Sequence, residues 1–523
     1  MTRKRFAVAI ALVLIAALAL AGCGRAKTQP ADGSGGSVAT GFKDTLVIGD
    51  AQGDPHGSWD PIDTFLVAWG TVASNIFEGL TSRGPELTLQ PGLATSWKYL
   101  DDKTLEFTLR QGAKFHNGEP FNADAVVFTF QRLLGPEGEK SPQRGNYESI
   151  ATVEKVDDYT VRFHLKNVDP TLLTKLAGYG GMIVPPKYIQ EKGDAYFDTH
   201  PVGTGPYAVT EYTKDSRVVL KRFDDYWGEK AKTPNVIVRF IPEDTTRVAE
   251  FQTGAVDIMQ NVPPSQVQSL SVDSNTQVIK VGGPTAFVLR LVTDKPPVNN
   301  VKVRQAIGYA VDTKTIIDTI LGGLGKQISS FQGDISFGNN PDLKPIEFNP
   351  DKAKQLIQAA GAKGANLDFY FNSNSSVQKE IAQAIASELK DVGLNVTLHP
   401  VEFQTLISDL IPNGKAGHMY LSGWGGWTLD FDNTAYLLYT KGQKWDPDFG
   451  DPKIDELLKA ERSTNDQSKR AEIFKEMTVR LRELMPDVPL YQGVEAWAVG
   501  KKVQGFTPPP DDRLWLVPVS VQQ

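Results

Sequence analysis

The side chains best suited to hold or transform a ligand gather in residues 416–433. Trp424 and Trp427 offer flat amphipathic surfaces, and Asp430 and Asp432 place carboxylates directly beyond them. Glycines between the tryptophans allow a close approach of the backbone, because Gly has no Cβ. An aromatic wall that ends in carboxylates suits a small molecule with an apolar body and a cationic end. The alternative is a loop at the edge of the core, with packed tryptophans and solvated aspartates.

The elements that would position this stretch alternate between helical and strand patterns. Residues 419–421 have the composition of a buried strand that ends at the glycines. Helices are expected at 304–320, 351–360, 378–392, 453–461 and 467–484, and strands at 367–371 and 394–398. Such alternation predicts an α/β domain. Asn122 is expected to cap a further helix over 125–134, because its side chain can accept a backbone hydrogen bond.

Length and charge narrow the class of protein. The chain has 523 residues, enough for two or three domains, and its 40 % apolar and 22 % charged residues are typical of soluble globular proteins. Its formal charge is −7, and it is −10 without the first 22 residues, which contain three cations and no acid. This acidity, without any run of Lys or Arg, argues against nucleic acid as the partner.

The N-terminus predicts export and a lipid anchor. Three cationic residues precede an apolar run over 6–20, which is too short for a comfortable membrane span and is typical of a signal peptide over 1–22. The following Leu-Ala-Gly-Cys resembles the lipobox of bacterial lipoproteins and implies that Cys23 is lipidated. Cys23 is the one cysteine of the chain, and polar, Gly-rich residues then make 23–42 a flexible tether.

Six blocks of the body resemble the peptide/nickel-type solute-binding proteins of ABC importers. The first contains Ala-Thr-Ser-Trp, Thr-Leu-Glu-Phe-Thr-Leu-Arg-Gln-Gly-Ala-Lys-Phe-His-Asn-Gly and Phe-Asn-Ala-Asp-Ala-Val, and the second contains Gly-Thr-Gly-Pro-Tyr and Arg-Phe-Asp-Asp-Tyr-Trp-Gly. The blocks follow one another in the family's order at 93–128, 203–228, 249–258, 303–312, 348–356 and 485–490. Each block is weak alone, but six in order across nearly the whole mature chain identify the family.

The resemblance implies an α/β fold with two lobes, like that of periplasmic binding proteins, which closes around a ligand. Lobe I would combine residues 43–82, 200–281 and 491–523, with 83–199 as an inserted subdomain. Lobe II would span 282–490. The chain would cross between the lobes at 282–284 and again at 486–489, and such crossings serve as hinges.

The resemblance also assigns a role to the opening stretch. Peptide binders of the family hold the ligand extended between the lobes through main-chain hydrogen bonds. Gly426 and Thr428 would then pair with the ligand backbone, beside Trp424 and Trp427, and Asp430 would face its α-ammonium. A buried carboxylate without a cation is costly, so such a site would select an ammonium. On lobe I, the corresponding contact segment offers three candidates: Phe65, Val67 and Trp69.

The identity of the solute stays open at this point. Some dipeptide binders of the family hold the ligand carboxylate with an arginine in the loop after the strand equivalent to 367–371, but here residues 372–376 read Asn-Ser-Asn-Ser-Ser. Longer peptides, or an amine without a carboxylate, therefore fit better, and sugars or metal chelates are alternatives. The six histidines are too scattered for a metal site defined by spacing: His56, His116, His164, His200, His399 and His418. We expect no metal and no cofactor.

Two other classes of protein are alternatives. Asp430 and Asp432 could be imagined as the two acids of a glycosidase, but acids two residues apart do not define that geometry. The chain has no Gly-x-Ser-x-Gly motif, and its cysteine belongs to the lipobox. An envelope interaction protein would need neither ligand nor closure. We expect no enzyme, but a monomeric, extracytoplasmic subunit that delivers its solute to a membrane permease with an ATPase.

Overall fold

The computed structural model describes residues 41–52, 54, 58–64, 67–84, 86–425, 427–443, 445 and 449–523. The predicted signal peptide, the tether and Cys23 lie outside these residues, as do Phe65 and Gly426. The backbone of Val67 begins helix α1 (Val67–Ala73), and its side chain lies outside the description. No helix in the described ranges combines the length and the apolar character that a membrane crossing requires.

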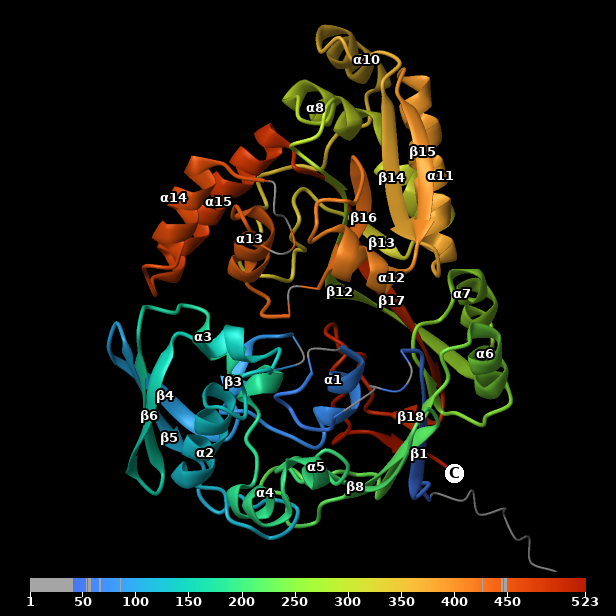
Figure 1. Cartoon of the computed structure of the whole chain (residues 1–523). Coiled ribbons are helices and arrows are strands. Elements are labelled where there is room, and N and C mark those ends of the chain that lie inside the picture. The colour runs from blue at the N-terminus through green and yellow to red at the C-terminus, as the bar shows by residue number, and fades with distance from the viewer. Residues whose placement is uncertain are drawn as a thin grey trace, which may run out of the picture. The chain divides into compact units, whose positions relative to one another are not determined.

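One mixed sheet runs through both lobes (Figure 1). In the described part of the chain it has eleven strands, in the order β15-β14-β16-β12-β17-β11-β1-β10-β9-β8, with β13 beside β17. Their bounds are β1 (Thr45–Asp50), β8 (Tyr207–Thr213), β9 (Arg217–Arg222), β10 (Asn235–Phe240), β11 (Ile258–Met259), β12 (Thr276–Leu291), β13 (Gly325–Gln327), β14 (Asn366–Asn372), β15 (Asn395–Val401), β16 (Met419–Trp424) and β17 (Asp487–Gly500). Helices alternate with these strands, so the predicted α/β class is confirmed.

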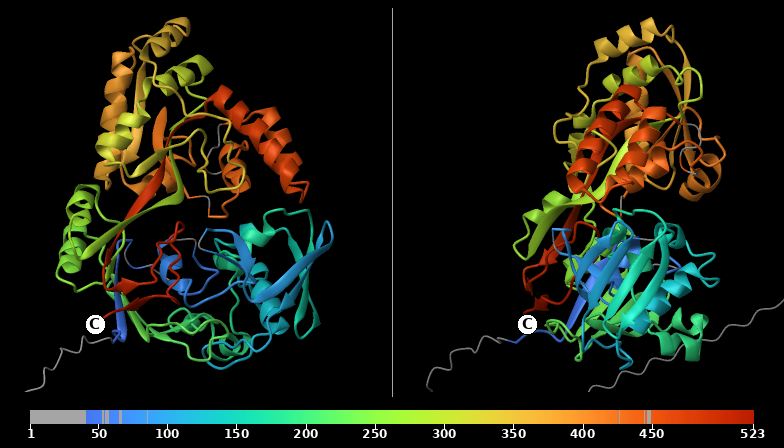
Figure 2. Two further views of the ribbon diagram at one scale, coloured as in Figure 1. Left: turned by 180° about the vertical axis from the view of Figure 1, so that it is seen from behind. Right: turned by 90° about the vertical axis from the view of Figure 1, so that its left-hand side faces the viewer.

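Strands β12 and β17 join the two lobes, as both views in Figure 2 show. They pair antiparallel along most of their length, and the register is interrupted between Gly282 and Ala286. At one end β17 pairs with β11 of lobe I, and at the other β12 pairs with β16 of lobe II. The sequence predicted crossings at 282–284 and 486–489. The second lies later, at 492–494, because Val488 and Leu490 still pack in the core of lobe II.

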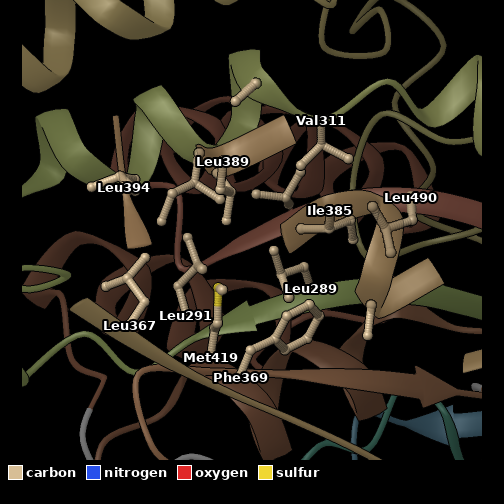
Figure 3. Close-up of a cluster of buried hydrophobic side chains, with 14 of the residues drawn as sticks. Leu289, Leu291, Val311, Leu367, Phe369, Ile385, Leu389, Leu394, Met419 and Leu490 are labelled. Atoms are coloured by element: carbon tan, nitrogen blue, oxygen red, sulfur yellow. The ribbon is translucent and has the colours of Figure 1, made fainter. Parts of the chain in front are cut away.

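The core of lobe II lies between its sheet and three helices that cover it (Figure 3). Leu289, Phe369 and Met419 meet there from three different strands. The helices are α8 (Val301–Ala310), α10 (Pro350–Ala359) and α11 (Ser376–Asp391). The predicted helix over 304–320 is divided in the structure into α8, α9 (Thr313–Thr315) and a π-helical turn over Ile316–Ile320 that continues α9. The Asp312 side chain accepts a hydrogen bond from Thr315 N and starts α9, which ends α8 early.

Three further helices form a second core of lobe II around Phe431 and Phe474. They are α13 (Phe431–Tyr439), α14 (Pro452–Glu461) and α15 (Gln467–Leu484). The last two correspond closely to the predicted helices over 453–461 and 467–484. Because α13 starts directly after residues 425–430, the packing of these helices sets the position of that loop.

The inserted subdomain is a four-stranded antiparallel sheet, in the order β4-β5-β7-β6, with one covering helix. The strands are β4 (Ala94–Asp101), β5 (Thr104–Leu109), β6 (Ile150–Asp157) and β7 (Thr160–Leu165), and the helix is α2 (Ala123–Leu134). Asn122 caps α2 as predicted, by accepting from Asp124 N at 3.0 Å. Helices α4 (Pro186–Lys192) and α5 (Asp194–Phe197) instead place Ile189 and Phe197 in the core of lobe I. The subdomain core therefore ends before residue 199.

Candidate ligand-binding site

A cavity of about 430 Å³ lies between the lobes, a volume within the usual range for small-molecule sites. Its lining combines the two crossings with both lobes and is largely apolar, apart from a group of acids. The crossings contribute Gly283, Pro284, Thr285 and Gly493; lobe I and the subdomain contribute Tyr179, Asn261, Glu495, Asp511, Asp512 and Arg513; lobe II contributes Phe287, Val377, Gly425, Trp427, Leu429 and Tyr491. A ligand here would touch both lobes, as closure requires.

Aromatic rings form one wall of the cavity. Trp427 of lobe II lies against Gly178 of the subdomain so closely that a Cβ on Gly178 would be 2.4 Å from the Trp427 ring. Tyr179, next to Gly178, also lines the cavity, and its ring packs edge-on against Trp69 at 5.1 Å between centroids. Trp69 is fully buried in the core of lobe I and stacks on Phe77. Trp69 therefore supports Tyr179 from behind, whereas the sequence predicted that it would contact the ligand itself.

Thr428 joins the lobes through its backbone. Its carbonyl accepts a hydrogen bond from Arg83 Nη2 of the subdomain at 2.9 Å. Arg83 is almost fully buried, and burial, together with the charge of Arg513, lowers its pKa to about 9. Leu429, which follows, has φ 54°, a left-handed conformation that a branched residue rarely adopts. The loop is thus turned sharply and tied to the opposite lobe. Thr428, predicted as a backbone partner of the ligand, has a protein partner here.

Asp430 has a different partner from the predicted ligand ammonium. Both of its oxygens accept from the guanidinium of Arg470 at 2.8 Å, and one of them also caps α13 by accepting from Asp432 N at 3.0 Å. Asp430 is 4 % exposed, and it is not part of the cavity lining given above. The cation that a buried carboxylate needs is therefore supplied by α15. In this arrangement Asp430 holds the loop in place.

A buried network continues from this pair. Arg470 also donates to Glu461 Oε2 at 3.0 Å, and Arg462 donates to Asp432 through Nε and Nη2. Burial and the neighbouring Asp432 raise the pKa of Glu461 to about 10, whereas the hydrogen bond with Glu461 and the charge of Arg462 outweigh burial and lower the pKa of Asp432. With Glu461 protonated, the charges of these groups cancel. The network is thus a neutral anchor beneath the 425–430 loop.

Trp424 lies in lobe II rather than at the cavity. Its ring meets Trp445 edge-on at 5.9 Å between centroids, and it packs against the core around Phe431. Of the eight residues predicted to bind ligand, Trp427 is the one among the described side chains that lines the cavity. Phe65, Gly426 and the side chain of Val67 lie outside the described residues.

Among the described residues, four carboxyls line the cavity, and two of them have arginine partners. Asp244 pairs with the buried Arg247 at 2.6 Å, and Asp511 accepts from Arg513 Nε at 2.7 Å. The other two, Glu495 and Asp512, are hydrogen-bonded to each other.

The pKa values of the Glu495–Asp512 pair follow from its surroundings. Burial, reinforced by Asp512, raises the pKa of Glu495 well above its ordinary value, and burial also raises that of Asp512. Within the described residues, no Lys, Arg or His forms a salt bridge with either carboxyl. The cavity is therefore suited to accept a positive charge.

Sequence reasoning missed the acids of the C-terminal segment. Glu495 lies between apolar residues in the second half of β17, and Asp511 and Asp512 follow three consecutive prolines, 508–510. An acid between apolar residues of a buried strand is the signal that could have drawn attention to Glu495, because buried acids need a partner or a function. No pattern in the sequence shows that residues 495 and 512 meet.

In the described ranges, three acids come close enough together to consider a metal ion: Asp60, Asp63 and Asp198. Arg132 already pairs with the buried Asp60, and Ser58 donates to Asp198 at 2.5 Å. His116 is buried and lies between Gly205 O and Gly203 N, and burial lowers its pKa to about 4. It therefore stabilises a turn as a neutral side chain.

Comparison with known proteins identifies the family. The sequence profile of the bacterial extracellular solute-binding proteins, family 5 Middle, matches residues 88–446, well over half of the chain. The chain belongs to this family. The resemblance drawn from the six sequence blocks is thereby confirmed.

Relatives and solved structures agree. A dipeptide-binding protein of Pseudomonas aeruginosa is 30 % identical over 506 residues, or 88 % of this chain and 92 % of that protein. Heme-binding protein A of Haemophilus influenzae is 29 % identical over 457 residues, or 81 % and 82 %. The structure of the ABC transporter-associated periplasmic binding protein DppA from Helicobacter pylori, in complex with peptide STSA, matches with a TM-score of 0.78 and 26 % identity over 92 % of this chain and 99 % of that one.

These findings confirm the bilobed periplasmic-binding-protein fold. They also confirm the predicted role, an extracytoplasmic solute-binding subunit of an ABC importer. Because the relatives include both peptide-binding and heme-binding proteins, the nature of the solute has to be argued from this chain's own cavity.

Proposed function

We propose that this subunit captures a small amine-bearing solute, with short peptides as the first candidates. The observation that carries the proposal is the cavity between the lobes, which combines an aromatic wall around Trp427 and Tyr179 with the carboxyls of Glu495 and Asp512. Rings receive the apolar body of such a solute, and acids receive its cation. The names of several relatives, which include dipeptide- and tripeptide-binding proteins, support the same class of ligand.

The transport cycle follows from the position of the cavity. A solute that touches both lobes stabilises the closed arrangement, and the closed form is what the membrane permease with its ATPase would recognise. The bent crossing at Gly282–Ala286 supplies a place for the hinge. Lipidation of Cys23 would keep the receptor at the membrane surface and leave it monomeric and free to close. No step needs chemistry on the solute, and ATP is consumed by the partner.

Native mass spectrometry of the chain without residues 1–23 tests the proposal. The protein is purified from cells under mild conditions, and the masses released on denaturation are recorded. We expect heterogeneous peptide masses, each with a free amine. A single mass without an amine would retain the importer role and overturn the class of solute. If nothing co-purifies, a thermal-stabilisation screen with peptides, sugars and metal chelates decides, and stabilisation by sugars or chelates alone would overturn the proposal.

A further inference from the structure

We propose that Glu495 and Asp512 form a carboxyl pair that shares one proton in the free receptor and gives it up to bind the solute's cation. This inference rests on the proposed function, because it assigns the amine of the solute to a specific subsite of the cavity. It also adds a property of that site: binding of a cationic solute releases a proton.

The geometry of the pair supports a shared proton. Glu495 lies on β17, opposite Val281 of β12, just on the lobe I side of the crossing. Asp512 reaches it from the C-terminal loop, and Gln260 Nε2 donates to Asp512 Oδ1 at 3.2 Å. A hydrogen bond between two carboxyls needs a proton on one of them, since ionised carboxylates only accept. Asp512 has φ 61°, and such left-handed conformations of non-glycine residues concentrate at functional sites.

One oxygen of the subsite has no hydrogen-bond donor among the described residues, which points to a ligand. Glu495 Oε2 is completely buried, and no N–H or O–H in the described residues donates a hydrogen bond to it. An unsatisfied buried oxygen is costly, and a cationic donor would satisfy it. Both residues line the cavity, so a solute there can reach them.

Two arginines that lie near the pair in the described part of the chain are engaged with other groups. Arg513 pairs with Asp511 and donates to Ala177 O at 2.7 Å. Arg247 pairs with Asp244 and donates to Gln260 O at 3.0 Å.

Among the described residues, two further acids act on the pair. Asp50, on β1, raises the pKa of Glu495 further, and Asp511 raises that of Asp512. A solute in the cavity can supply the positive charge that the pair would attract. An ammonium next to the pair favours its ionised form, so the proton leaves to solvent as the ion pairs form.

The sign of the pH dependence follows from this exchange. Low pH keeps the proton on the pair and opposes the cation, so affinity for an amine falls as the pH is lowered, by up to tenfold per pH unit while one proton is released. The affinity for a solute without a cation should not change in this way. Replacing Glu495 with Gln keeps the shape and the uncharged form of this one side chain but removes its ability to ionise.

The test compares a library of tripeptides with free N-termini and the same library with acetylated N-termini. Thermal stabilisation is measured from pH 5 to pH 8 for the wild type, for Glu495→Gln and for Glu388→Gln. Glu388 is a matched control, because burial also raises its pKa, to about 7, but it lies on α11, outside the cavity lining given above. We expect the free-amine library to stabilise the wild type and Glu388→Gln, with a thermal shift that grows as the pH rises. The affinity of Glu495→Gln for the same library, derived from its thermal shift, should be at least tenfold weaker.

The outcomes separate this inference from the proposed function. Equal stabilisation of the wild type by both libraries would confirm a peptide receptor and overturn the subsite. Stabilisation by neither would overturn peptides as the solute class. The shared proton is then tested in the free protein by infrared difference spectra between the wild type and Glu495→Gln. A protonated-carboxyl band that the variant loses, beside the band that Glu461 contributes to both proteins, supports the pair, and identical protonated-carboxyl bands in both overturn the inference.

Discussion

Replacing Asp430 with Asn separates a structural role of this residue from a ligand-binding role. The substitution keeps a side chain that can cap α13 but removes the charge that pairs with Arg470. Breaking a buried ion pair from one side costs about 3–5 kcal/mol, because the remaining charge is left without compensation. Here the loss should be smaller, about 2–4 kcal/mol, because Glu461 already contacts Arg470 at 3.0 Å and can ionise to replace Asp430.

The pH dependence of this loss identifies the mechanism. In the wild type the pKa of Glu461 is raised to about 10, so the stability that its protonated form provides is fully present below its unfolded pKa of about 4.5 and is lost as the pH rises toward 10. In Asp430→Asn, Glu461 becomes the partner of Arg470 and stabilises the fold once it is ionised, above about pH 4.5. The destabilisation should therefore be larger at pH 5 than at pH 9.

The assay is denaturant unfolding at several pH values, with peptide affinity measured on the same samples. Asp466→Asn is the matched control, since Asp466 caps α15 by accepting from Ser468 N at 3.0 Å but is paired with no buried cation. It should lower the free energy of unfolding by less than about 1 kcal/mol. If Asp430→Asn kept its stability and lost affinity more than tenfold, the structural role would be refuted, and Asp430 would face the ligand as the sequence predicted.

Two further predictions concern the contacts between the lobes. Arg83→Gln removes the charged donor to Thr428 O, a hydrogen bond worth about 1.5–3 kcal/mol, so ligand affinity should fall about tenfold to a hundredfold. Small-angle scattering of the ligand-free variant should show a wider distribution of lobe separations. An unchanged scattering profile with unchanged affinity would contradict the prediction. Gly178→Ala places a Cβ 2.4 Å from the ring of Trp427 and should weaken ligand binding several-fold in calorimetry, whereas Gly145→Ala, with nothing within 4 Å of the added Cβ, should leave it unchanged.

The fold was largely predictable because its signals are local or cover most of the chain. The amphipathic helices over 351–360 and 467–484 appear as α10 and α15, and Asn122 caps α2. The predictions of helix bounds and of the subdomain's end were wrong where contacts between distant parts of the chain determine the structure. Asp312 divides the predicted helix over 304–320 because its side chain caps a new helix, and the spacing of apolar residues in the sequence does not show this break. Likewise, helices α4 and α5 joined the lobe I core because of packing across elements distant in sequence.

The site was less predictable, because charge partners far apart in the chain decide it. Asp430 looked free beside the tryptophans, but Arg470 lies forty residues away and reaches it only once α13 and α15 pack together. Trp69 has the type and position of a ligand contact, yet it is fully buried behind Tyr179. Trp427 lines the cavity, where the sequence predicted an aromatic surface, and its contact with the ligand stays a prediction.

The distribution of charge partners explains how the cavity can be both stable when empty and selective. Asp244, Asp430 and Asp511 each have an arginine, so their ion pairs are complete with or without a solute. Glu495 and Asp512 have each other, and a shared proton spares the empty cavity a second unpaired charge. An arriving cation replaces that proton, whereas a neutral solute would leave Glu495 Oε2 unsatisfied. Selection for an amine therefore arises from a pair that carries one negative charge at rest and two in the complex.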